Sequence, residues 1–221
     1  MIKIHEQGKD KLKLSLATDM STSLANAIRR SALEIPVMAI DELDIIKNDS
    51  ALYDEMIAHR IGLIPIKTEK GVKETKFKLK EVGPKTVYST DIKPDVETGY
   101  KIPIVILDNE QELEMVADAR LGKGIDHIKY SPGLVFFKHN IDPEVLDYVY
   151  VDQEGKIVFD EEELDLKKIS EELKNKIKKA KDASELIFSI ESWGQIAPKE
   201  IFSKAIEALD ENLEELDKLV K

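Results

Sequence analysis

No cysteine occurs among the 221 residues of this sequence. Without a thiol, the chain has no disulfide, no thiolate zinc site, no cysteine-ligated iron–sulfur cluster and no cysteine nucleophile. The sequence also lacks a continuous apolar run of the roughly 18 residues that a membrane helix needs, and its best runs are 61–66 and 102–107. Residues 1–7 contain no apolar stretch of signal-peptide length. We therefore expect a cytoplasmic protein that does not enter the membrane.

Positive charge is the second deficit. The sequence has 33 Lys and Arg against 44 Asp and Glu, which gives a formal net charge of −11. Because phosphate binding draws on clustered Lys and Arg, this balance argues against a nucleic-acid grip based on net charge and leaves open only a local basic patch. Apolar residues make up 42% of the chain, which is typical of a globular protein with a core of its own.

The N-terminal part of the sequence predicts mixed α/β structure. Residues 11–16 alternate polar and apolar side chains, which is the period of a strand with one buried face. Leu24 and Ile28 recur at helical spacing after potential N-cap residues, so we expect a helix over about Thr22–Leu33. Residues 37–46 are rich in β-branched side chains and predict a strand.

The C-terminal part predicts a strand followed by a long helix. Apolar side chains alternate over 186–190, and Pro198 suits the first position of a helix. The following apolar residues have heptad spacing: Phe202, Ile206, Leu209, Leu213, Leu216 and Val220. A helix over Pro198–Val220 would span about 35 Å. Its apolar seam can pack on the chain's own sheet, on a partner's equivalent helix, or on both along its length.

The middle of the sequence predicts a β-rich region with little regular helix. Gly and Pro separate several short strand candidates between residues 76 and 138. A short helix is expected over 51–61, an extended segment over 62–66, and a hairpin with strands near 148–151 and 156–159. Residues 160–181 have the spacing of a thin amphipathic helix, for which a solvated surface is favoured over a binding arm.

No catalytic motif is evident. The sequence has no His-Glu-x-x-His, no P-loop and no glycine-rich dinucleotide loop. Glu55 and His59 are four residues apart on the expected helix and could form an acid–base pair, but without a nucleophile a surface salt bridge is the favoured interpretation. Asp41 and Glu42 point to opposite faces of the expected strand, which disfavours a shared metal ion. The patterns favour an interaction module over an enzyme acting alone.

Arg29 and Arg30 form a doublet on the expected first helix. Burial of the apolar face that contains Leu24 and Ile28 leaves both arginines beside that face. The doublet serves either solubility or hydrogen bonding at an interface, for which the planar fork of arginine is well suited.

Four segments together resemble the alpha-type assembly subunits of multisubunit RNA polymerases. Residues 23–30 (SLANAIRR) and 34–40 (EIPVMAI) resemble the family signature. Residues 54–66 (DEMIAHRIGLIPI) resemble its archaeal and eukaryotic branch, which contains the archaeal D-type subunits and the eukaryotic third-largest subunits. Residues 189–196 (SIESWGQI), with the helix after them, are similar to the closing strand and helix of the family.

The resemblance implies an α+β fold in two parts. A discontinuous α/β dimerisation domain would comprise residues 1–46 and 185–221, and an inserted β-rich domain would comprise residues 47–184. In the family, the dimerisation helices pair with the smaller subunit L. This pair and further small subunits form the platform that receives the large catalytic subunit.

The family's roles map onto specific residues of this sequence. Arg29 and Arg30 match the doublet that contacts the large subunit. The pairing surface with subunit L would include Leu24, Ile28, Phe202, Ile206, Leu209, Leu213 and Leu216. The implied function is that of a non-catalytic assembly subunit of DNA-directed RNA polymerase. No Asp-x-Asp-x-Asp cluster is present to hold catalytic Mg²⁺, so we expect no nucleotidyl transfer by the chain alone.

Three alternatives remain beside this interpretation. The first is a homodimeric alpha-like module in which the same helices pair with themselves. The second is an enzyme that uses Glu55 and His59. The third is direct contact with DNA, which the net charge disfavours.

The missing cysteines also bear on the subtype. Some archaeal members carry a ferredoxin-like insertion with an iron–sulfur cluster, and some eukaryotic relatives have a cysteine zinc site. This sequence has no ligand for either, so we expect no cofactor and no metal. Residues 148–184 lie where the insertion would fall, and our hypothesis is that they are a reduced, cluster-free remnant of it.

Overall fold

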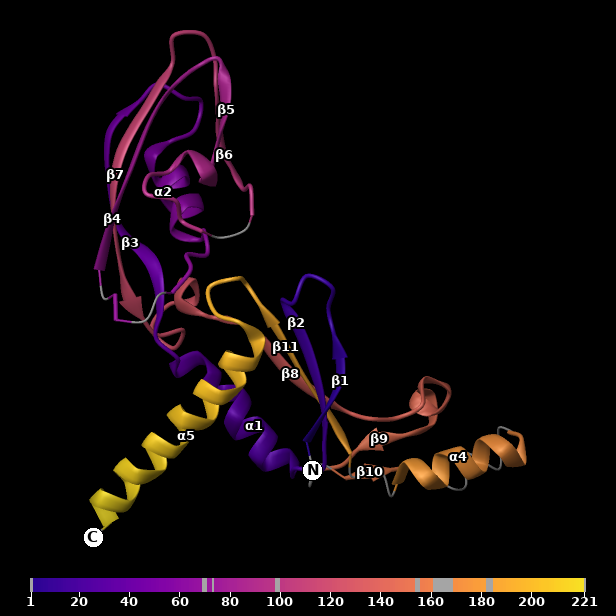
Figure 1. Cartoon of the computed structure of the whole chain (residues 1–221). Coiled ribbons are helices and arrows are strands. Elements are labelled where there is room, and N and C mark those ends of the chain that lie inside the picture. Colours follow the sequence, from indigo (N-terminus) through magenta and orange to yellow (C-terminus); the bar gives the residue numbers. More distant parts are fainter. Residues whose placement is uncertain are drawn as a thin grey trace.

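The computed structural model describes residues 2–68, 71–72, 74–97, 100–153, 156–160, 169–181 and 185–220. Its helices and several separate sheets confirm the expected α+β class. Figure 1 shows an elongated β-rich lobe, a second sheet at its base with helices beside it, and a smaller arm that carries helix α4 (Glu171–Lys181). Within the described residues, no helix combines the length and the hydropathy of a membrane span.

The basal sheet is antiparallel, with the strand order β1-β2-β11-β8. Its strands are β1 (Ile2–Gln7), β2 (Lys13–Thr18), β11 (Leu186–Ser192) and β8 (Gly133–His139). The pairing of β2 with β11 places the two ends of the sequence side by side, with Leu16 opposite Phe188. Leu14 and Leu16 are buried, as the alternation in the sequence predicts, whereas the adjoining edge strand β1 was not anticipated.

Two helices cover one face of this sheet. Helix α1 (Thr22–Ser31) begins at Ser21, whose Oγ accepts a hydrogen bond from the Leu24 N–H at 3.3 Å, and continues into the short 3₁₀ helix η1 (Ala32–Glu34). Helix α5 (Pro198–Val220) has the predicted bounds and packs against α1, β11 and β2. At the centre of this core, the Phe188 ring lies 5.5 Å from the Phe202 ring in an edge-to-face arrangement.

The β-rich lobe has a separate core. Its three-stranded antiparallel sheet has the order β3-β7-β4, formed by β3 (Val37–Asn48), β7 (Glu112–Gly122) and β4 (Glu74–Val82). The remaining elements are the helix α2 (Asp54–Gly62), the hairpin of β5 (Lys85–Tyr88) with β6 (Pro103–Leu107), and the 3₁₀ helix η2 (Ser89–Asp91). Ile57 and Ile61 of α2 are fully buried against this sheet.

The arm is a third, smaller unit. It consists of the 3₁₀ helix η4 (Pro143–Tyr148), the two-residue strands β9 (Tyr150–Val151) and β10 (Ile157–Val158), and α4. Val145 and Ile177 are fully buried where α4 meets η4. The predicted hairpin is confirmed, and the predicted charged helix is present over Glu171–Lys181, while residues 161–168 lie outside the described residues.

Two expectations about the middle of the chain need correction. Residues 62–64 are not extended as expected, because Gly62 still belongs to α2 and the next two residues leave the helix as a turn, while 65–66 lie in no regular element. The predicted insertion, 47–184, includes β8, yet β8 pairs with β11 in the basal sheet. The reason is that Val135 and Phe137 pack on the basal core rather than on that of the lobe. The predicted boundary at 46/47 falls within β3, which pairs with β7 in the lobe along its length. The other domain boundaries stay a prediction.

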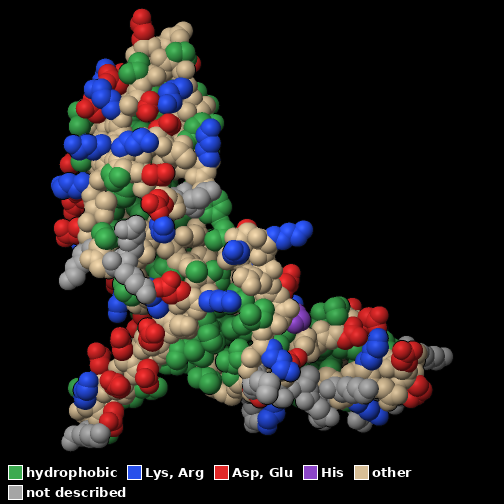
Figure 2. Space-filling model, viewed as in Figure 1, with side chains coloured by type: hydrophobic (Ala, Val, Ile, Leu, Met, Phe, Trp, Pro, Cys, Tyr) green, Lys and Arg blue, Asp and Glu red, His purple; other side chains and the backbone are tan. Residues whose placement is uncertain are grey.

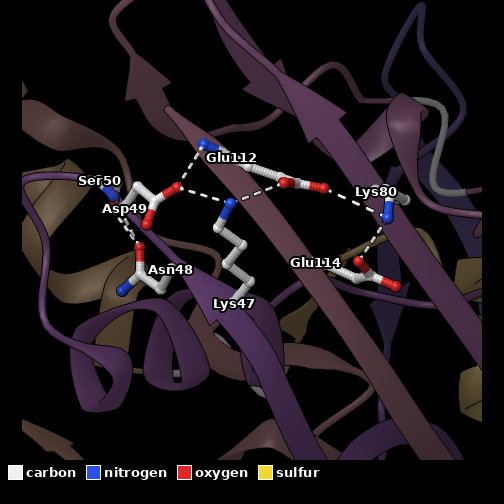
Figure 3. A network of polar contacts seen from close by, with 7 residues as sticks. All are labelled: Lys47, Asn48, Asp49, Ser50, Lys80, Glu112 and Glu114. Atoms are coloured by element: carbon white, nitrogen blue, oxygen red, sulfur yellow. Dashed lines mark hydrogen bonds and ion pairs between the residues drawn. The ribbon is translucent and has the colours of Figure 1, made fainter. Parts of the chain in front are cut away.

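A network of charged side chains joins the three strands of the lobe (Figure 3). Lys47 Nζ lies 2.9 Å from Glu112 Oε2 and 3.3 Å from Asp49 Oδ2, and Lys80 Nζ lies 3.2 Å from Glu112 Oε1 and 2.6 Å from Glu114 Oε2. The hydrogen bonds of Lys47 and then of Lys80 hold the pKa of Glu112 below its ordinary value. One carboxylate of β7 thus links β3 on one side to β4 on the other.

Candidate protein–protein interface

Helix α1 uses most of its apolar face within the chain. Ile28 is only 4% exposed and packs in the basal core, so it has little surface left for a partner, contrary to its predicted role. Leu24 lies one turn earlier, beyond the edge of that core, and is 46% exposed. Of the two predicted contact residues on α1, only Leu24 presents a substantial apolar surface.

Helix α5 buries a different face from the one that its heptad pattern indicates. Ile201 and Ala205 are its most deeply buried residues after the first turn, and neither belongs to the heptad positions. Phe202 and Leu209 lie beside this face and are partly buried against the basal core. The heptad residues that stay exposed are Ile206, Leu213, Leu216 and Val220. The apolar seam is therefore divided between the chain's own core and its surface.

The C-terminal half of α5 extends away from the rest of the molecule (Figure 1). Every residue from 210 to 220 is exposed, and Asn212 Nδ2 donates to both carboxylate oxygens of Glu34 at 3.0 Å. Leu213 and Leu216 are 55% and 56% exposed. Short helices are only marginally stable in water unless an apolar face packs against something, so this segment has the properties of one half of an interface.

The surface around these helices is divided by chemistry (Figure 2). Hydrophobic side chains gather where α1 lies against the basal sheet, and acidic side chains follow the projecting part of α5. Residues 207–218 contain six acidic residues and one lysine. At about 100° per residue, Asp210 and Asp217 lie next to the apolar stripe on one side, so a partner of this helix meets a narrow apolar stripe with one acidic edge.

The arginine doublet is split between two environments. Arg29 is partly buried, and its Nε and Nη2 donate to Asn26 Oδ1 at 3.1 and 2.9 Å. Arg30 is exposed and has no ion pair or hydrogen bond with any described residue. At about 100° per residue, Arg30 lies on the side of α1 opposite its buried residues. Arg30 therefore points to solvent, while Arg29 borders a groove.

This groove lies between the basal layer and the lobe and has a volume of about 800 Å³. The end of α1, the segment after α2, residues 100–103, the start of β8 and the turn 193–195 all contribute to its walls. A further wall comes from the 3₁₀ helix η3 (Ile128–Tyr130). No single stretch of sequence contains this surface, so sequence patterns could not reveal it.

The partly buried carboxylate of Asp41 holds η3 in place. The sequence patterns did not indicate this role. Asp41 Oδ1 accepts hydrogen bonds from Lys129 Nζ at 2.7 Å and from the Tyr130 hydroxyl at 2.8 Å, and Asp41 Oδ2 lies 2.6 Å from Arg120 Nε. The Lys129 ammonium is the main reason why the pKa of Asp41 lies below its ordinary value. The partners are 79 or more residues away in sequence, so no local pattern signals this cluster.

The candidate acid–base pair is not assembled. Glu55 and His59 are both exposed on α2, and no hydrogen bond or ion pair joins them in the described structure. The residues described here also contain no group of three or more His, Asp or Glu side chains placed to hold a metal ion. Among the described residues, the features that could bind another molecule are therefore the exposed apolar stripe of α5 and the groove.

Strand–helix segments from both ends of the chain are joined in one sheet and bear a partly uncovered helical face, an arrangement that suits contact with another protein. The family model of the RNA polymerase Rpb3/Rpb11 dimerisation domain matches residues 10–213. The chain therefore belongs to this family, and the resemblance seen in its sequence motifs is confirmed.

Three relatives match almost the full length of the chain, and each is a DNA-directed RNA polymerase subunit Rpo3. The protein of Thermococcus kodakarensis is 32% identical over 98% of this chain and 98% of its own length. The protein of Methanobrevibacter smithii is 30% identical over 100% and 97%. The protein of Archaeoglobus fulgidus is 30% identical over 100% and 97%.

Proposed function

We propose that this chain is a non-catalytic assembly subunit of an archaeal DNA-directed RNA polymerase that pairs with the smaller subunit L through α1 and α5. The observation that carries the proposal is the exposed apolar stripe of α5, in particular Leu213 and Leu216 on a helical segment that the rest of the chain leaves uncovered. Family membership and the Rpo3 relatives support it.

The energetics of such a pairing are adequate. An interface of standard size buries about 1,600 Å² of surface, of which about 60% is apolar, and at about 25 cal/mol per Å² this gives roughly 20 kcal/mol of gross driving force. Lost translational and side-chain freedom offsets most of it. The apolar contacts would come from four exposed side chains: Leu24, Ile206, Leu213 and Leu216. Phe202 and Leu209, which are partly buried against the basal core, would hold this part of α5 in place.

The proposed platform role assigns the arginine doublet to the large catalytic subunit. Arg30 is exposed without a partner among the described residues, and Arg29 is held by a neutral amide oxygen. Both guanidinium groups therefore keep hydrogen-bonding capacity for a carboxylate or carbonyl of another subunit. The small platform subunits would bind elsewhere on the pair. Direct contact with nucleic acid is not part of the proposal, because the net charge is −11.

The proposal also covers cofactors and location. With no cysteine, the chain has no ligand set for the iron–sulfur cluster or the cysteine zinc site of some family members, so we propose a cofactor-free cytoplasmic subunit. Residues 148–184 would be the reduced remnant of the ferredoxin-like insertion, supported by the hairpin and α4 in this segment. Stoichiometric iron or zinc in elemental analysis of the purified chain would contradict this.

Co-expression with subunit L of the same organism tests the central proposal. The two chains should co-purify and elute together in size-exclusion chromatography. The variant Leu213→Asp with Leu216→Asp should abolish the complex, because pairing would bury two unpaired charges. Sedimentation of the chain alone and with subunit L separates the proposal from the homodimer: a dimer in the absence of subunit L that its addition does not change would support the homodimeric module.

A further inference from the structure

The groove between the basal layer and the lobe exposes large apolar side chains from five different segments. Each is between 41% and 67% exposed. They are Leu63, Tyr100, Ile128, Leu134 and Trp193. Soluble monomers rarely leave contiguous apolar surface of this kind uncovered, and such surface marks a binding site when polar groups surround it.

The walls of the groove are held in place by hydrogen bonds. The Trp193 N–H donates to the Pro132 carbonyl at 3.2 Å, and the Gly194 N–H donates to Ser192 Oγ at 2.9 Å. Gly194 has φ = 106°, a conformation that favours glycine, so the turn that presents Trp193 is specified by the sequence. On the opposite wall, η3 is fixed by the bonds of Asp41. A preformed site of this kind binds with little ordering cost.

The charges at the groove are positive, although the chain is acidic. Arg29 is bonded only to the neutral Asn26 among the described residues, and Lys101 Nζ lies 4.2 Å above the Tyr88 ring without a carboxylate partner among those residues. Lys129, the third cation of the groove, is already paired with Asp41. Two cations of uncompensated charge therefore flank the apolar surface.

A buried acceptor without a partner also belongs to the groove. Gln195 is 4% exposed, and its Oε1 forms no hydrogen bond in the described structure. A buried polar atom of this kind is unfavourable until a donor reaches it. Trp, Tyr and Arg, the residue types that dominate binding energy at protein interfaces, all line the same groove as Gln195.

We propose that this groove receives an extended segment of the large catalytic subunit that carries apolar side chains next to a carboxylate. The apolar side chains would pack on Trp193 and Leu134, and the carboxylate would lie between Arg29 and Lys101. The inference rests on the proposed function, in which Arg29 contacts the large subunit, and it adds the chemistry and the position of the contact. Nucleic acid fits less well, because the surface is apolar and only two uncompensated cations flank it.

Binding of the large subunit to the purified pair with subunit L tests the groove. The variant Trp193→Ala with Leu134→Ala should weaken this binding by at least about tenfold, since aromatic anchors in grooves carry much of the binding energy. The matched control is Tyr53→Ala, which removes an exposed aromatic side chain next to α2, away from the groove. The control should bind like the wild type.

A second variant tests the charges. Arg29→Glu with Lys101→Glu should also weaken binding by at least about tenfold, and it should reduce the loss of affinity that the wild type shows with rising salt. Lys78→Glu changes an exposed lysine of the lobe that has no ion pair among the described residues, and it serves as the charge control.

The outcomes separate the two proposals. If both groove variants keep pairing with subunit L and bind the large subunit as the wild type does, the groove inference is overturned while the pairing stands. If the chain does not pair with subunit L but binds the large subunit through the groove, the pairing is overturned and the groove stands. Failure of the wild-type pair to bind the large subunit, or competition by single-stranded nucleic acid for the groove, would also overturn the groove inference.

Discussion

Truncation of the exposed stripe of α5 should weaken pairing with subunit L without harm to the free chain. Leu213→Ala with Leu216→Ala is the informative variant, because both side chains lie in the fully exposed part of the helix. Alanine is also the better helix former, so the helical content of the free chain should not fall. Leu209 is less suitable, since it packs against the chain's own core and its loss would affect folding as well.

The expected magnitude follows from the exposed fractions. Truncation of leucine to alanine removes about three carbon groups, each worth about 0.8 kcal/mol when fully buried. Leu213 and Leu216 are 55% and 56% exposed in the free chain, so only about half of that value is gained on pairing. Each truncation should therefore cost about 1.3 kcal/mol of binding free energy, and both together should raise the Kd about 80-fold.

Isothermal titration of the chain with subunit L would measure this effect. The matched control is Glu214→Ala with Lys218→Ala, which introduces two alanines in the same turns but on the opposite side of α5 and should leave the Kd within about twofold of the wild type. A rise of less than about fivefold for the leucine variant, with unchanged circular dichroism, would refute the assignment of this stripe to the interface.

Other perturbations test the fold that presents the site. Ile201→Ala should lower the unfolding free energy by about 2–5 kcal/mol in urea denaturation, whereas Ile206→Ala, at an exposed site on the same helix, should cost much less; equal losses would contradict the assigned buried face. Gly122→Ala should cost about 1–3 kcal/mol in the same assay, because the new Cβ would lie 2.6 Å from the Tyr130 ring; no loss would show that this approach is not tight. The folded-state pKa of Asp41 lies below its ordinary value of 3.8, so its ion pairs stabilise the chain above pH 3.8, and this stabilisation is lost as the pH falls through the lower folded-state pKa. The stability difference between the wild type and Asp41→Asn should therefore shrink in acid, and a difference independent of pH would count against the network.

The sequence predicted local structure well where a local signal existed. Pro198 and the heptad spacing gave the bounds of α5, and the capping residues before Leu24 gave the start of α1. Periodicity fixes the relative phase of apolar residues but not which of them a sheet will cover. For that reason, the burial of Ile201 and Ala205 in place of the exposed heptad positions could not be foreseen.

Features built from distant segments were not accessible in this way. The pairing of β8 with β11 depends on Phe137 lying opposite Phe188, and nothing near either residue encodes that register. The groove depends on five or more segments at once, and Trp193 alone gave no sign that Leu63 and Ile128 lie on the same surface. Family resemblance indicated the pairing helices and the doublet. Only the structure showed that Arg29 is partly buried and bonded to Asn26, whereas Arg30 is exposed.

The charges beside the apolar stripe of α5 bear on the choice between subunit L and self-pairing. Of the six acidic residues in 207–218, Asp210 and Asp217 lie next to the stripe, both on the same side of the helix. If two copies of this helix paired antiparallel along the stripe, these aspartates would face the aspartates of the other copy, and this repulsion opposes association. A partner helix with basic residues at the facing positions gains attraction instead. The charge pattern thus disfavours antiparallel self-pairing and suits a different subunit with a basic edge, although the apolar stripe alone would suit either.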